Sequence, residues 1–303
     1  MRCWRIFYFV KLSRSSPCKV NLLLNILGKR ADGFHELETV MQPIGLCDEI
    51  AFERSASGIE LTCSDPALPT DSSNLVHRAA AAFFQRSGIS AGVRMHLEKR
   101  IPMAAGLGGG SGNAATTLLA LNDLFGTPLA PEHLHSIAAS LGSDIPFFLQ
   151  TQPALATGRG EQIQPLRSFR ALEGCAFLLV HPGFGIATAW AYKELARFPS
   201  ALNGERGRAA KLISLLGTGD LRKASREFYN SLEAPALDKY PWLAVLQDFL
   251  RENGAAAALM SGSGSTTFAI TNDLCGAQEL EERVKEKFGR CWTAVVLAEQ
   301  VDQ

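Results

Sequence analysis

Apolar and polar side chains alternate along residues 16–28, the stretch SPCKVNLLLNILG. The two sides of this alternation are, in order, Val20, Leu22, Leu24 and Ile26, and then Lys19, Asn21, Leu23 and Asn25. A period of two residues is typical of a half-buried β-strand. Lys19 and Asn21 are therefore expected to point in the same direction.

Further strand patterns follow in the first half of the chain. Asp32 and Gly33 mark a turn into a second strand. Apolar runs near residues 49–54 and 58–63 and an alternating segment at 92–102 predict additional strands. We therefore expect a first portion rich in β-sheet.

Three segments show helical spacing instead. Residues 72–88 predict a helix that Asn74 caps and Gly88 ends. A second helix is predicted from Ser111 to Phe125, and a third from Pro131 until Gly142. Ser143 and Asp144 consequently fall just past a helix.

The remainder of the chain alternates apolar strand patterns with helical ones, without internal repeats. This order is typical of an α+β fold. The length of 303 residues favours two domains. We place them at residues 1–165 and 166–303.

Composition narrows the class of partner. Thirty basic residues balance thirty acidic ones, so neither nucleic acid nor an anionic membrane is expected as a main partner. Seven scattered cysteines indicate a reducing cytoplasm, and neither they nor the histidines have metal-ligand spacing. The apolar run at residues 6–10 is too short for a membrane span, and we expect an extension or an edge strand there.

A glycine-rich stretch, IPMAAGLGGGSGNAAT, joins the strand at 92–102 to the second helix. Glycine N–H groups can turn inward around an anion, and a helix N-terminus adds free donors. The spacing fits neither a P-loop nor a dinucleotide fingerprint. A phosphate cradle and a merely tight strand-to-helix turn both remain open from this stretch alone.

The same stretch resembles the signature loop of the GHMP kinases, the superfamily of galactokinase, homoserine kinase and mevalonate kinase. Four other segments are similar to the branch of that superfamily whose acceptor is 4-diphosphocytidyl-2-C-methyl-D-erythritol. They are SPCKVNLLLNILGKRADGFHELETV, LGSDIPFFL, ATGRGEQIQPL and MSGSGSTTFAI, in the expected order across residues 16–270.

The resemblance implies a two-domain α+β fold with an N-terminal domain like domain 2 of ribosomal protein S5 and a ferredoxin-like C-terminal domain. It also implies ATP and Mg²⁺ as cofactors, small-molecule substrates, and a monomer or homodimer without a side-chain metal centre. The residues it assigns to ATP are Pro102, Met103, Ala104, Ala105, Gly106, Leu107, Gly108, Gly109, Gly110, Ser111 and Gly112.

Two residues are expected to carry the phosphoryl transfer. Asp144 resembles the catalytic aspartate of the family, although a turn residue bonding backbone N–H groups would look the same. Lys19 matches the family lysine beside that aspartate, whereas on its own it could extend from a sheet edge into solvent. Asn21 is expected to bind substrate hydroxyls. Sequence leaves open whether Asp144 is a base or an orienting group.

The cytidine moiety requires aromatic faces and groups that read its base edge. The resemblance assigns Phe34 and His35 to it, with phenylalanine where the family usually has tyrosine. A looser match suggests Thr188 and Tyr192, with Trp190 as an alternative to the tyrosine and core packing as the other role for each ring. A second glycine-rich turn is expected around the substrate diphosphate, at Gly262, Ser263 and Gly264.

Two positions depart from the family pattern. Gly112 stands where a serine is common, which removes a hydroxyl expected near the phosphates, and Cys18 stands where alanine is usual. Two other functions stay open: another GHMP kinase acting on a small alcohol, and a ligand sensor that kept the fold.

Overall fold

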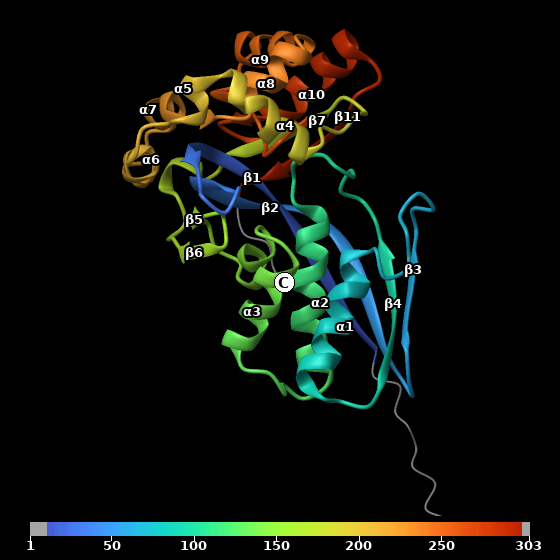
Figure 1. Cartoon of the computed structure of the whole chain (residues 1–303). Helices are drawn as coiled ribbons and strands as arrows, with labels where there is room; N and C mark the ends of the chain where they lie inside the picture. The colour runs from blue at the N-terminus through green and yellow to red at the C-terminus, as the bar shows by residue number, and fades with distance from the viewer. Residues whose placement is uncertain (1–10, 299–303) are drawn as a thin grey trace, which may run out of the picture.

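Two β-sheets, each with helices on one side, organise the chain in the computed structural model, which describes residues 11–298 (Figure 1). The first sheet contains β1 (Lys11–Lys29), β2 (His35–Ser55), β3 (Ile59–Cys63), β4 (Gly92–Glu98), β5 (Ala154–Gly158), β6 (Gln162–Pro165) and β8 (Tyr229–Asn230). The second contains β7 (Ala176–His181), β9 (Ala257–Met260), β10 (Thr267–Thr271) and β11 (Trp292–Leu297).

The first sheet is built on the long antiparallel pair β1 and β2. Its strand order is β3-β4-β2-β1-β8, and β5 pairs with the early part of β2. The expected turn at Asp32 and Gly33 lies between β1 and β2, and the two expected runs after it belong to β2 and β3. A register shift between Asn21 and Leu23 bends β1 where it passes the site described below.

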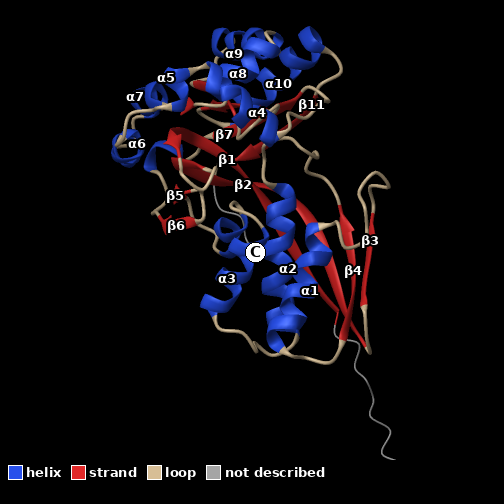
Figure 2. Cartoon of the chain, viewed as in Figure 1, coloured by secondary structure: helices blue, strands red, loops and turns tan. Residues whose placement is uncertain are grey.

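The three helices predicted in the first half are confirmed and cover one face of this sheet (Figure 2). They are α1 (Leu75–Ser87), α2 (Gly109–Leu124) and α3 (Pro131–Leu141). Asn74 caps α1 by accepting from the N–H of Val76 at 2.9 Å, and Gly88 ends it in the left-handed conformation. Both follow from local chemistry that the sequence already indicates.

The second sheet has the strand order β11-β7-β10-β9, antiparallel throughout. In chain order this is 4-1-3-2, the ferredoxin-like arrangement that was expected. The helices of this half are α4 (Thr188–Glu194), α5 (Pro199–Leu202), α6 (Arg208–Gly217), α7 (Leu221–Ala224), α8 (Glu233–Lys239), α9 (Trp242–Glu252) and α10 (Leu274–Phe288). The α+β fold is thus confirmed, whereas the boundary at residue 165 stays a prediction.

One apolar core joins the two halves, and it corrects the expectation for β1. Val20 and Leu22 of β1 share a cluster with Phe177 and Phe268 of the second sheet. Every residue from Ser16 to Ile26 is buried, so this part of β1 is covered on both faces rather than half-buried. The sequence pattern misses this because the covering elements, α2 and the second sheet, are far from β1 in the sequence.

Most of the N-terminal segment lies outside the described residues, including the apolar run at 6–10. Lys11 to Ser15 extend β1 and pair with β2, as an extra strand segment. Six cysteines of the described part are free thiols. Among residues 11–298, no helix combines the length and apolar character that crossing a membrane requires.

Candidate active site

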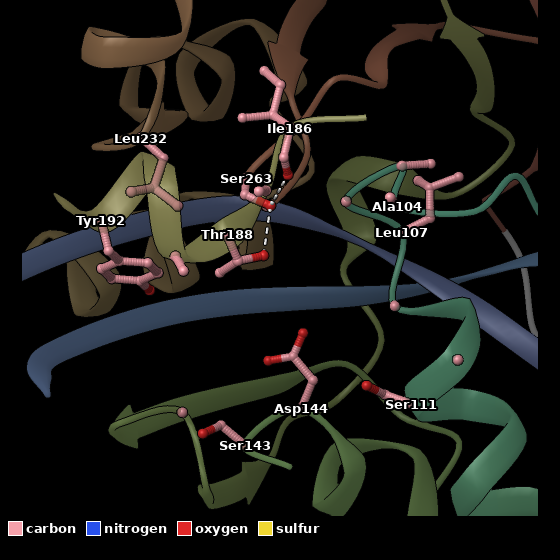
Figure 3. Close-up of a pocket in the computed structure, with 18 of the residues that line it drawn as sticks. Ala104, Leu107, Ser111, Ser143, Asp144, Ile186, Thr188, Tyr192, Leu232 and Ser263 are labelled. Carbon is pink, nitrogen blue, oxygen red and sulfur yellow. Dashed lines mark hydrogen bonds between the residues drawn. The ribbon is translucent and has the colours of Figure 1, made fainter. Parts of the chain in front are cut away.

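A cavity of about 1200 Å³ lies between the two halves (Figure 3). Its wall combines β1, the glycine-rich loop, the segment after α3, the start of α4 and the turn after β9. The residues expected at the site that line it are Lys19, Asn21, Phe34, His35, Pro102, Met103, Ala104, Ala105, Gly106, Leu107, Gly108, Gly109, Gly110, Ser111, Asp144, Thr188, Tyr192, Gly262 and Ser263. Residues up to 244 positions apart are brought together here by the fold.

Lys19 points into the molecule, not out from a sheet edge. Its side chain is 3% exposed, and its ammonium donates to Asn21 Oδ1 at 2.6 Å and to the carbonyl of Gly106 at 2.9 Å. Asp144 Oδ2 lies 3.9 Å from the same Nζ. Burial lowers the pKa of Lys19, and the Asp144 carboxylate acts in the opposite direction. The cation is held between the glycine loop and a carboxylate.

Asn21 is oriented by the strands around it. Its amide donates to Thr39 Oγ1 at 2.8 Å, and the Thr39 hydroxyl donates to the carbonyl of Leu23 at 2.5 Å. Because the amide nitrogen is used in this way, Asn21 Oδ1 faces the Lys19 ammonium. Lys19 and Asn21 therefore share one direction, as the alternation predicts.

Asp144 immediately precedes a short 3₁₀ helix, η1 (Ile145–Leu149), at its N-cap position. Its carboxylate makes no capping hydrogen bond to that turn, and its side chain is 46% exposed toward the cavity. In Figure 3 the carboxylate points into the open space, with Ser111 at the start of α2 beside it. The backbone-capping role that the sequence left open for Asp144 does not occur.

The glycine loop is locked against the turn after β9. Ser261 Oγ donates to the carbonyl of Gly106 at 3.0 Å, and the N–H of Thr266 donates to the carbonyl of Ala105 at 3.2 Å. A Cβ at Gly106 would overlap the carbonyl oxygen of Ser261, and Gly106 has a φ of 78°. Glycine is required there by both close approach and backbone conformation. The two glycine-rich turns thus form one wall.

Aromatic side chains gather at the other end of the cavity. The rings of His35 and Tyr192 lie 5.0 Å apart between centroids, and the guanidinium of Arg159 lies 4.6 Å above the ring of Phe34. Phe34 itself is 50% exposed. Burial and the charge of Lys29 lower the pKa of His35, while burial and Asp144 raise that of Tyr192. Both rings are accordingly neutral near pH 7.

Three expected residues lie differently from the rest. Trp190 packs beside Tyr240, with ring centroids 6.4 Å apart, so it is Tyr192 that lines the cavity. Gly264 lies behind the cavity wall, next to Met260. A Cβ at Gly112 would come 2.5 Å from the carbonyl of Pro17, so this glycine allows α2 to approach β1 and does not face the cavity.

Several lining residues were missed by the sequence reading. They are chiefly Lys29, Lys99, Asn113, Ser143, Arg159, Ile186, Lys193 and Leu232. Arg159 lies in the segment ATGRGEQIQPL, which resembles the family. An arginine between two glycines in that segment could have indicated a residue of the site. The others carry no local pattern that distinguishes them from surface or core positions.

Comparisons with known proteins agree with this geometry. Residues 74–152 match the model of the GHMP kinases N terminal domain, and residues 210–290 match the GHMP kinases C terminal model. The 4-diphosphocytidyl-2-C-methyl-D-erythritol kinase of Pelotomaculum thermopropionicum is 41% identical over 88% of this chain and 91% of its own. That of Protochlamydia amoebophila is 42% identical over 84% and 83%. The chain belongs to the 4-diphosphocytidyl-2-C-methyl-D-erythritol kinase family.

Solved structures extend the same result. A crystal structure of a 4-(cytidine 5'-diphospho)-2C-methyl-D-erythritol kinase superposes with a TM-score of 0.79, at 34% identity, over 94% of this chain and 99% of that one. Homoserine kinase from Cytophaga hutchinsonii superposes with a TM-score of 0.74 at 19% identity, over 96% and 95%. The second likeness concerns the fold alone. The GHMP kinase fold expected from the sequence is therefore confirmed, and the family within it is the cytidyl branch.

Proposed function

We propose that this chain transfers the γ-phosphoryl group of ATP to the 2-hydroxyl of 4-diphosphocytidyl-2-C-methyl-D-erythritol, a step of the non-mevalonate route to isoprenoid precursors. The observation that carries the proposal is the position of the Lys19 ammonium, bonded to the carbonyl of Gly106 and 3.9 Å from Asp144. One cation thereby joins the loop suited to phosphates and the carboxylate suited to an acceptor hydroxyl.

ATP would bind with its phosphates along residues 106–111. The N-terminus of α2 begins at Gly109 and presents backbone N–H groups and the positive end of the helix dipole. The Ser111 hydroxyl lines the same wall. Mg²⁺ fits this wall as a nucleotide-bound ion, held mainly by phosphate oxygens with the Ser111 hydroxyl in reach, and it would neutralise phosphate charge.

The acceptor would bind at the opposite end, with its cytosine near the rings of Phe34, His35 and Tyr192. Neutral His35 can donate with one ring nitrogen and accept with the other, which suits a base edge. Thr188 Oγ1 and Ser263 Oγ lie 3.0 Å apart at the middle of the cavity, where a diphosphate would pass. The 2-hydroxyl would then reach Asp144.

The chemical roles follow from what phosphoryl transfer requires. Lys19 can stabilise negative charge on the acceptor oxygen, and Asp144 can accept the hydroxyl proton or orient the hydroxyl. Asn21 fixes the Lys19 ammonium and lines the cavity, where it can bind an acceptor hydroxyl. The balanced net charge supports small-molecule substrates, and the free thiols support a cytoplasmic location. The proposal includes a monomer or homodimer, as the resemblance implies.

The test is a coupled assay for ADP release in the presence of Mg²⁺. It compares 4-diphosphocytidyl-2-C-methyl-D-erythritol with 2-C-methyl-D-erythritol 4-phosphate and with homoserine. Of the three acceptors, we expect only the cytidyl compound to be turned over. Turnover with homoserine would reassign the chain to another GHMP kinase activity, and turnover with none of the three would favour a sensor.

A further inference from the structure

A buried carboxylate outside the cavity holds the start of the glycine loop. Asp48 on β2 is fully buried, and its Oδ1 accepts from the N–H groups of Arg100 and Ile101 at 2.7 and 2.8 Å. Its Oδ2 accepts from Lys99 Nζ at 2.6 Å. All three donors lie directly after β4, in the segment that leads into Pro102 and the loop.

The position of Asp48 explains why a side chain is needed here. The β2–β4 ladder begins with Glu49 opposite Glu98, so Asp48 faces the point where β4 has ended. The N–H groups of Arg100 and Ile101 lie beyond the end of the β2–β4 pairing and have no backbone carbonyl of β2 as acceptor. The Asp48 carboxylate accepts their hydrogen bonds instead. The carboxylate thereby fixes the backbone path into the glycine loop.

The same carboxylate fixes a cation at the start of α2. Lys99 has a side chain 7% exposed that lines the cavity, and its ammonium also donates to the carbonyl of Ile101 at 2.5 Å. A Cβ at Gly109, the first residue of α2, would lie 3.3 Å from Lys99 Nζ and 3.0 Å from a methyl group of Ile101. The clamped segment thus packs directly on the first turn of the phosphate-facing helix.

We propose that Asp48 is a positioning residue for the ATP phosphates, acting through Lys99 and the backbone of residues 100–101. This inference rests on the proposed function, because it takes residues 106–111 as the phosphate site. Charge-assisted hydrogen bonds at a buried carboxylate are the strong kind, so the clamp is suited to holding a loop to a fraction of an ångström.

The test compares Asp48→Asn with wild type. The oxygen of the substituted amide can still accept from both backbone N–H groups, and its NH₂ then faces the Lys99 ammonium, which loses its carboxylate acceptor. We expect the KM for ATP to rise about tenfold, the scale of one lost charge-assisted hydrogen bond. The KM for the cytidyl substrate and kcat at saturating ATP should change less than about threefold, because the acceptor end is untouched.

Glu49→Gln is the matched control. Glu49 is the neighbouring carboxylate and pairs with the exposed guanidinium of the same Arg100 at 3.1 Å, from the solvent side. It should leave both KM values unchanged, since exposed pairs contribute little. An Asp48→Asn enzyme with an unaltered KM for ATP, or with both KM values raised together, would overturn the inference.

Two further measurements keep the result decisive. If Asp48→Asn does not fold, Asp48→Asn with Lys99→Met buries no unpaired charge and is judged by the same criterion. If wild type shows no turnover with the cytidyl compound, the proposed function fails, and the inference is decided by calorimetric ATP affinity. An equal ATP Kd in wild type and Asp48→Asn would then reject it.

Discussion

At the scale of single residues, the buried ammonium of Lys19 links the two ends of the cavity. Its partners are a backbone carbonyl, an amide oxygen and, at 3.9 Å, a carboxylate. A buried cation is tolerated only when it is paired in this way. Asp144 contrasts with it, because the carboxylate is half exposed and free to meet a substrate hydroxyl.

Asp144→Asn should lower kcat by a factor on the order of 10² or more, the scale of general acid–base contributions. The KM for ATP should stay near its wild-type value, because the carboxylate lies beyond the glycine loop. Steady-state kinetics measures both. Asp123→Asn, which removes an exposed carboxylate paired with Arg14 at 3.2 Å, is the matched control. A fully active Asp144→Asn enzyme would rule out the assigned role.

Phe34→Ala should raise the KM for the cytidyl substrate by about three- to tenfold, since one aromatic stacking contact contributes about 0.5–1.5 kcal/mol. The KM for ATP should not change, because Phe34 lies at the other end of the cavity. Phe198→Ala is a suitable control, because Phe198 also has an arginine over its ring, at 5.7 Å, away from the cavity. A selective rise in the KM for ATP would show that the two pockets are assigned wrongly.

The pKa of His35 should lie below its ordinary value of 6.5, because burial and Lys29 both disfavour the imidazolium. As the pH falls, His35 is therefore protonated in the unfolded chain before it is protonated in the folded protein. Protonation of His35 thus favours unfolding, so the stability that the protein has with neutral His35 above about pH 6.5 is lost as the pH drops below that value. Lys29→Gln should raise the pKa in an NMR titration. Lys211→Gln, a remote lysine paired with Glu227, should not. Equal shifts in both variants would contradict this.

At the scale of elements, α2 both carries the phosphate-facing turn and packs on β1. The sequence suggested that Gly112 costs the loop a hydroxyl, but the structure assigns it a packing role. A Cβ at this position would meet the carbonyl of Pro17 at 2.5 Å and Ser16 Oγ at 3.2 Å. The side-chain hydroxyl of Ser111, one residue earlier, faces the cavity instead.

Gly112→Ser should consequently destabilise the protein, by about 1–3 kcal/mol if it behaves like other overpacked core positions. Urea unfolding followed by circular dichroism measures the change. Gly110→Ser is the control, since a Cβ there would meet only a methyl group of Leu75 at 3.7 Å. Serine is a better helix former than glycine, so this control should not lose stability. Equal losses in the two variants would show that the approach of α2 to β1 is not the cause.

At the scale of the whole molecule, the site exists because two halves share one wall. The glycine loop of the first half accepts hydrogen bonds from Ser261 and Thr266 of the second, and β8 joins the first sheet beside β1. Asn230 of β8 donates to the carbonyls of Met260 and Gly262 at 2.8 Å each. A ligand in the cavity therefore stabilises both halves together.

ATP with Mg²⁺ should accordingly raise the unfolding temperature. At a ligand concentration of one hundred times Kd, binding adds about 2.7 kcal/mol to the free energy of unfolding. Differential scanning calorimetry should show one transition that moves upward as a unit. Adenosine at the same concentration lacks the phosphates and should move it far less. An equal shift with adenosine would place the binding energy away from the glycine loop.

Much of the fold was predictable from the sequence because it depends on neighbours in the chain. The Asn74 cap, the Gly88 and Gly142 stops, the C-terminal end of α2 and the turn before His35 all follow from local hydrogen bonding and backbone freedom. The shared direction of Lys19 and Asn21 follows from the strand period. The family followed from the segments quoted above, each of which is contiguous.

Only the tertiary structure decided the features that join distant segments. The burial of β1 on both faces, the packing role of Gly112 and the choice of Tyr192 over Trp190 depend on elements a hundred residues away or on one helix face among several. The hydrogen bonds from residues 99–101 to Asp48 have no local sequence signature. An aspartate within a strand pattern looks the same whether or not its carboxylate accepts hydrogen bonds from the end of a neighbouring strand. The periodicity of the sequence indicates on which face of a strand or helix a side chain lies. Packing between segments that are distant in the sequence determines which residues that side chain contacts.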